Sequence, residues 1–116
     1  MRALFVCSQN KLRSPTAEDT FASWEGIEVA SAGTDNDAVT PLSGDLIEWA
    51  DVIFVMERTH QAKMTRKFND LLRGKKIVCL AIPDEFERGD PRLVAMLIEY
   101  AGVVGSMNAP SSPTTI

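Results

Sequence analysis

The residues of this sequence that could do chemistry together lie in one short segment near its start. Cys7 supplies a thiol, and Arg13 supplies a planar guanidinium that can hold two oxygens of one oxyanion. The apolar residues 3–6 precede the segment, and Ser14-Pro15 follows it as a typical helix start. The pattern predicts a buried strand that leads into a loop bearing the thiol, with a helix directly behind the loop.

Such a loop suits the binding of an anion. The N–H groups at a helix start lack partners and carry partial positive charge, and a tight loop can aim further N–H groups at the same point. The same field favours the thiolate of Cys7, which is the nucleophilic form. Ser14 could cap the helix and also donate its hydroxyl to the sulfur. The alternative without function is a small buried Cys7 at a strand end and a solvated Arg13.

Composition limits the class of protein. The chain has 116 residues, enough for one domain, and its 45% hydrophobic and 24% charged residues are typical of a soluble globular fold. A net charge of −4 disfavours nucleic-acid binding, and no apolar run is long enough to span a membrane. Met1-Arg2 leads directly into a strand, so we expect no signal peptide. The two cysteines form no disulfide framework, and one histidine predicts no zinc site, so we expect a cytoplasmic protein without metal or cofactor.

Hydrophobic periodicity predicts strands and helices in strict alternation. The expected strands are residues 3–7, 27–30, 52–56 and 76–81, and the expected helices are 14–24, 43–50, 59–68 and 91–100. Thr59 and Asp90 are the expected caps of the last two helices, with Pro91 at the first helical position.

This order predicts an α/β fold, a doubly wound four-stranded parallel sheet with helices on both faces. Ligands of such sheets bind beyond the carboxyl ends of the strands, where the loop of Cys7 begins. We expect one domain over residues 1–104, and a flexible tail over 105–116, which is rich in Ser and Pro.

Several segments resemble low-molecular-weight protein tyrosine phosphatases. Residues 5–18, FVCSQNKLRSPTAE, are similar to the family's signature of Cys, Asn and Arg-Ser-Pro after the first strand. Residues 31–34, SAGT, resemble the end of its second strand, and residues 51–57 resemble its third strand and the acidic turn that follows. Residues 82–86, IPDEF, stand where the family has an acidic loop. The resemblance extends to about residue 100 and implies the same fold.

The resemblance also implies roles. Cys7 would attack phosphorus and form a cysteinyl-phosphate, Arg13 would clamp the phosphoryl oxygens, and Asp84 would protonate the leaving oxygen. Asn10 would hold the loop in shape, with Ser14 and with Ser31 as loop support. The residues expected to bind the substrate are Ser8, Gln9, Asn10, Lys11, Leu12 and Ser14.

The sequence contains two candidates for the general acid. The family has Asp followed by Pro and an aromatic residue, whereas Asp84 is followed by Glu85 and Phe86. The literal Asp-Pro pair is Asp90-Pro91, which also serves as a helix start. Asp84 is favoured because it lies closer to the strand end.

Other departures concern the pocket. Leu12 replaces the family's second loop cysteine, so no disulfide can form within the loop. Gln9 replaces a glycine, which puts a side chain near the pocket. The aromatic residue that walls the family's pocket is missing, which leaves the pocket open or walled by Phe86 alone. His60 lies near the start of the third helix and could face the pocket, but we favour a solvated residue there.

The favoured function is a cysteine-dependent phosphatase that acts on aryl phosphomonoesters, with a phosphorylated protein or a small aryl phosphate as its partner. An arsenate reductase would need further thiols, and Cys79, inside an apolar strand, is the sole candidate. A non-catalytic module that binds phosphate or phosphoproteins is the third hypothesis.

Overall fold

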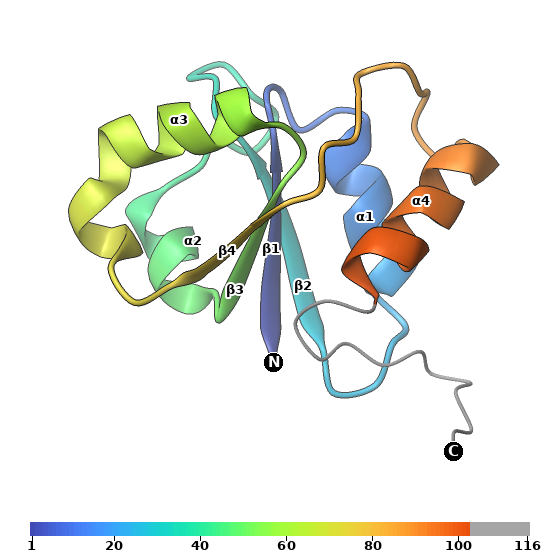
Figure 1. Ribbon diagram of the computed structural model, residues 1–116, viewed down its shortest axis with the longest axis horizontal. Coiled ribbons are helices and arrows are strands. Elements are labelled where there is room, and N and C mark those ends of the chain that lie inside the picture. The colour runs from blue at the N-terminus through green and yellow to red at the C-terminus, as the bar shows by residue number, and fades with distance from the viewer. Residues whose placement is uncertain (103–116) are drawn as a thin grey trace.

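The four apolar segments form one parallel sheet in the order β2-β1-β3-β4, shown in Figure 1. The computed structural model describes residues 1–102, so the predicted tail over 105–116 lies outside the described residues. The elements are β1 (Arg2–Cys7), α1 (Arg13–Phe21), β2 (Glu28–Gly33), α2 (Gly44–Trp49), β3 (Val52–Val55), α3 (Arg58–Phe68), the 3-10 helix η1 (Asn69–Leu72), β4 (Lys76–Cys79) and α4 (Pro91–Ala101).

Helices cover both faces of the sheet, so the predicted α/β architecture is confirmed (Figure 1). On one face, side chains of α1 and α4 pack against Phe5 and Phe54 of the central strands. On the other face, α2, α3 and η1 pack against Leu4 and Ile53. Successive residues of a strand point to opposite faces, which is why the central strands are continuously apolar.

The core on the α1 and α4 face is aromatic. The ring of Phe5 stacks on those of Phe21 and Phe54 with centroids 5.5 and 5.0 Å apart, and Trp24 meets Phe21 edge to face at 4.6 Å. All three phenylalanines are fully buried. Burial of each contributes about 2–3 kcal/mol, which fixes α1, and with it the end of the Cys7 loop, against the sheet.

Several predicted boundaries need correction. The second strand extends to Gly33, because residues 31–33 continue the pairing with β1 as far as Cys7. The first helix begins at Arg13 and ends at Phe21, so Ser14 lies inside it and is not its cap. The cap of α3 is Glu57, not Thr59.

The cap of α4 is the one predicted from the sequence. The Asp90 side chain accepts from the N–H of Arg92, and Pro91 takes the first position of α4, as predicted. The last strand is shorter than expected, because Ala81 adopts a φ of 55° in the left-handed region. No helix among residues 1–102 is long and apolar enough to cross a membrane.

Candidate active site

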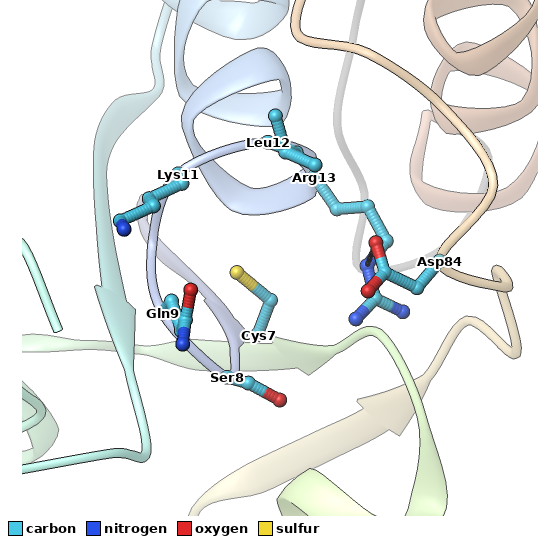
Figure 2. Close-up of a pocket in the computed structure, with 7 residues that line it drawn as sticks. All are labelled: Cys7, Ser8, Gln9, Lys11, Leu12, Arg13 and Asp84. Atoms are coloured by element: carbon cyan, nitrogen blue, oxygen red, sulfur yellow. Dashed lines mark ion pairs between the residues drawn. The ribbon is translucent and has the colours of Figure 1, made fainter.

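An open cavity lies at the carboxyl end of β1, where the chain turns into α1. Its volume is about 340 Å³. Figure 2 shows the thiol of Cys7 at its base, with Arg13 and Asp84 together on one side. The lining residues are Cys7, Ser8, Gln9, Lys11, Leu12, Arg13 and Asp84. Two segments far apart in the sequence, the loop from Cys7 to Arg13 and the segment of Asp84, therefore meet at one place.

The loop curls around the sulfur of Cys7. Asn10 adopts a φ of 57°, a region that Asn tolerates better than most residues, and this bend turns its N–H toward the sulfur at 3.3 Å. The Ser14 hydroxyl lies 2.9 Å from the same sulfur and 2.9 Å from Oδ1 of Asn10. Asn10 and Ser14 thus hold the loop in shape together.

The serine hydroxyl has one proton and two acceptors within reach. When Cys7 carries its proton, the thiol donates to Ser14 and Ser14 donates to Asn10. When Cys7 is a thiolate, the Ser14 proton is drawn to the sulfur, and the N–H of Asn10 adds a second donor. The network therefore accommodates both protonation states of the candidate nucleophile without moving a heavy atom.

Arg13 is buried with only 4% of its side chain exposed. Its Nη1 donates to the carbonyl of Ile82 at 2.8 Å and to the carboxylate of Glu57. Its Nε lies 3.8 Å from Oδ1 of Asp84. These contacts anchor a cation that would be costly to bury alone and set the orientation of its fork.

The two candidate acids differ in position. Asp84 lines the cavity beside Arg13, with 64% of its side chain exposed. Asp90 caps α4, and its hydrogen bonds to Arg92 hold the pKa of its carboxyl below the ordinary value. Asp90 does not line the cavity. The geometry therefore favours Asp84 as the group that can reach a substrate.

His60 was expected to be solvated, and this expectation is wrong. Its side chain is buried, and its Nε2 lies 2.9 Å from the hydroxyl of Ser8 in the loop. Its Nδ1 accepts from the N–H of Glu57, so the neutral ring carries its proton on Nε2 and donates it to Ser8. Burial, and next the charge of Arg13, lower the pKa of His60 to about 4.

The sequence did not identify Glu57 as part of the site, and it favoured a solvated His60 over one that faces the pocket. One local signal was present, because Glu57 and His60 have the spacing of a capping box, in which each side chain accepts from the other's backbone N–H. That signal identifies the start of α3. It does not reveal that His60 reaches Ser8 or that Glu57 reaches Arg13.

Ser31 does not support the loop directly, contrary to expectation. Its hydroxyl donates to Oε1 of Glu18 on α1 at 2.5 Å. Support comes instead from backbone groups after β2, since the N–H of Thr34 donates to Cys7 O and that of Asp35 donates to Ser8 O, both at 2.9 Å. Gly33 permits this approach, because a Cβ there would lie 2.5 Å from Ser8 O.

The outer part of the cavity is polar and open. Gln9 and Lys11 are exposed at its rim beside the half-buried Leu12. Phe86 does not form a wall, because its side chain is buried in the core, with the Arg92 guanidinium 5.2 Å from its ring centre. Among the described residues, no aromatic side chain lines this cavity.

Cys79 faces away from the site. It pairs in register with Val55 and belongs to the core on the α2 and α3 face, whereas Cys7 belongs to the opposite core. The sheet therefore separates the two thiols. Among residues 1–102, no three His, Cys, Asp or Glu side chains group closely enough to hold a metal ion.

Solved structures share this fold. The YwlE arginine phosphatase, as a variant with a phosphorylated active-site serine, is 22% identical, with a TM-score of 0.69 over 86% of this chain and 90% of that chain. Wzb from Vibrio vulnificus with bound benzylphosphonate is 22% identical, with a TM-score of 0.69 over 86% and 93%. A low-molecular-weight phosphotyrosine phosphatase from Vibrio cholerae O395 is 21% identical, with a TM-score of 0.63 over 87% and 92%. Neither a family model nor a curated protein sequence matches the chain. The predicted likeness to the low-molecular-weight phosphatase fold is confirmed.

Proposed function

We propose that this protein is a cysteine-dependent phosphatase that hydrolyses aryl phosphomonoesters, with phosphotyrosine in proteins as the favoured substrate. The observation that carries the proposal is the meeting of Cys7, Arg13 and Asp84 around one open cavity. A nucleophile, an oxyanion clamp and an acid are the groups that such a reaction requires. The likeness to solved phosphatases supports the same conclusion.

In the first step, the Cys7 thiolate attacks phosphorus in line with the leaving oxygen. A sulfur–phosphorus bond forms and the phosphorus–oxygen ester bond breaks. The electron pair of that bond goes to the leaving oxygen, which takes a proton from the Asp84 carboxyl. Arg13, anchored by Ile82 and Glu57, and the N–H groups of the loop stabilise the charge on the equatorial oxygens. The phosphorylated serine in the YwlE variant supports a covalent intermediate.

In the second step, a water molecule attacks the phosphorus of the cysteinyl-phosphate. The Asp84 carboxylate accepts a proton from this water, the sulfur–phosphorus bond breaks and inorganic phosphate leaves. The sulfur departs as a thiolate, stabilised by the Ser14 hydroxyl and the Asn10 N–H. Asp84 is exposed at the cavity, so water can reach it.

Ser8 would be a phosphate ligand held in place by His60. Because the Nε2–H of His60 donates to the Ser8 oxygen, the serine proton is left to donate to a phosphoryl oxygen in the cavity. The pKa of about 4 keeps His60 neutral over the working range, so this orientation persists. His60 acts through Ser8 and is a positioning residue.

The open pocket bears on substrate choice. Benzylphosphonate bound to Wzb supports an aryl substrate class. The pocket of this chain lacks an aromatic wall among its described lining residues and carries Lys11 and Gln9 at its rim. A substrate is therefore held mainly through its phosphoryl group, and we propose a phosphorylated protein or a small aryl phosphate. A catalytic thiolate is preserved in a reducing compartment, so we propose a cytoplasmic location.

The two alternatives fit the geometry less well. An arsenate reductase must resolve its cysteine adduct with further thiols, and Cys79 lies across the sheet from Cys7. A non-catalytic phosphate-binding module has no use for an acid, whereas Asp84 lines the cavity beside Arg13.

The test is hydrolysis of p-nitrophenyl phosphate in the presence of a metal chelator. Cys7→Ser should abolish turnover, whereas the matched control Cys79→Ser should retain it, since its sulfur faces the other core. Arg13→Lys should lower kcat by about 10²–10³-fold, because a lysine lacks the fork. Normal turnover by Cys7→Ser would contradict the covalent mechanism. A panel with phosphotyrosine, phosphoserine and phosphoarginine peptides and with arsenate then separates the substrate classes.

A further inference from the structure

A second cavity, of about 230 Å³, lies between α3 and the loop that follows β2. Lys63, Arg66 and Lys67 line it from the helix, and Thr34 and Asn36 line it from the loop. Positions three and four apart share a helix face, so the helix presents these cations on one side. The cavity is separate from the one that contains Cys7 and Asp84.

The cavity carries net positive charge in an acidic protein. Lys63 pairs with the carboxylate of Asp35 at 3.4 Å, and Lys67 donates to the neutral amide oxygen of Asn36 at 2.6 Å. Among residues 1–102, no ion pair is formed by Arg66, whose side chain is exposed. Arg66 and Lys67 lie in the last turn of α3, where their charges interact favourably with the helix dipole. That role does not require a cavity between these residues and the loop.

Thr34 contributes an unmet hydrogen bond. It is 7% exposed, and its hydroxyl has no partner among the described residues. A buried hydroxyl without a partner is unfavourable, and an anionic oxygen that reached it from the cavity would accept a hydrogen bond from it. A cationic cavity with an unpaired donor in its lining is suited to a carboxylate or a phosphoryl group.

The cavity is connected directly to the catalytic loop. The N–H of Thr34 donates to Cys7 O, and that of Asp35 donates to Ser8 O. A molecule that fills both cavities would therefore extend across the loop that these two bonds support. Arg66 and Lys67 also line a further hollow of about 590 Å³ over residues 66–71, so the concave surface continues along the helix end. A polypeptide fits such an extended surface better than a single small ion.

We propose that this cavity is a second oxyanion site, which takes an acidic or phosphorylated side chain of the polypeptide whose phosphorylated residue enters the catalytic cavity. The inference rests on the proposed phosphatase function and names the class of substrate that the enzyme prefers. Phosphopeptides with an acidic residue near the phosphorylated position are favoured, because their second anion pairs with Arg66 and Lys67.

The first experiment measures kcat/KM for phosphotyrosine peptides that carry one glutamate at each flanking position in turn, each compared with its glutamine counterpart. At the position that reaches the cavity, glutamate should raise kcat/KM by about three- to tenfold. Arg66→Gln should reduce this ratio to near one. The matched control Arg73→Gln, which removes the same charge from an exposed residue outside the cavity, should leave the ratio intact. A ratio near one at every position in the wild-type protein, or a preference that survives Arg66→Gln, would overturn the proposal.

The second experiment does not depend on turnover. Inorganic phosphate is titrated into the Cys7→Ser protein while the Arg66 Nε–H and Thr34 methyl signals are followed by NMR. Saturable shifts of both signals, with the Thr34 shift lost in the Cys7→Ser, Arg66→Gln double variant, support the site. No saturable shift overturns it. If no peptide is hydrolysed while these shifts occur, the proposed function fails and the anion site stands.

Discussion

His60 is the chain's one histidine, so its contribution to the pH dependence of stability can be isolated. Its side chain is 2% exposed, and both ring nitrogens are engaged, Nδ1 by the N–H of Glu57 and Nε2 by the Ser8 hydroxyl. Protonation would put a hydrogen on Nδ1 and break the bond to Glu57, next to the charge of Arg13. The folded state therefore resists protonation of this ring.

The sign of the effect follows from the two pKa values. The pKa of His60 is about 4 in the folded protein and 6.5 when unfolded, so the unfolded chain binds more protons between these values. The stabilisation is complete above about pH 6.5 and is lost as the pH falls toward 4. At about pH 5 the lost stability amounts to about 2 kcal/mol for this group alone.

The assay is urea unfolding at a series of pH values for the wild-type protein and for His60→Gln. Glutamine can still accept the backbone bond at the third position of α3 but does not titrate. Carboxylates titrate in both proteins and cancel in the difference between them. The unfolding free energy of the wild-type protein minus that of His60→Gln should therefore fall by about 2 kcal/mol from neutral pH to about pH 5. Thr59→Gln, a change at the exposed neighbouring residue, should follow the wild-type curve.

Two results would refute this reasoning. The first is an NMR titration of the single imidazole with its midpoint near 6.5. The second is a pH dependence of stability in His60→Gln that is indistinguishable from that of the wild-type protein. Either would mean that the ring is accessible to water and that the bond to Ser8 does not persist.

Four further substitutions test the site. Asp84→Asn should lower kcat for aryl phosphates by about 10²-fold or more and remove the part of the pH–rate profile that reports the general acid. Asp90→Asn should leave the rate near wild type and lower only the thermal stability. The reverse outcome would move the acid to Asp90. Glu57→Gln should lower the unfolding free energy by about 1–3 kcal/mol and raise KM, because Arg13 loses a charged partner; unchanged urea midpoint and KM would argue against an anchoring role. Gly33→Ala should lower the unfolding free energy by about 1–3 kcal/mol and reduce activity, because its Cβ would meet the carbonyl of Ser8; a fully active, equally stable variant would show that the loop can adjust.

The local parts of the site were predictable because their geometry is decided within a few residues. The loop from Cys7 to Arg13 is a contiguous segment between a strand and a helix, so residue order alone brings thiol and guanidinium together. The Asp90-Pro91 start of α4 is local in the same way. The alternation of apolar runs with helical periodicity likewise determined the doubly wound sheet, since short connections leave few topologies.

The misplaced residues were those whose partners are distant along the chain. His60 had the appearance of a solvated helix-start residue, yet it meets Ser8 across the end of the sheet. Phe86 was expected as a possible pocket wall, but its ring is buried in the core, where burial of apolar surface stabilises the fold. Ser31 belongs to a stretch that resembles a loop support, yet its hydroxyl donates to Glu18 on α1.

The sequence by itself determined the loop that brings Cys7 and Arg13 to one place, because strand, loop and helix start are consecutive in the chain. Only the tertiary structure decided what surrounds that loop. Arg13 is oriented by Glu57 and Ile82, Asp84 rather than Asp90 reaches the cavity, and the sheet isolates Cys79 from the candidate nucleophile. These outcomes depend on the order of the strands and on which face of the sheet each side chain occupies. Both are determined by pairing between strands that lie far apart in the sequence.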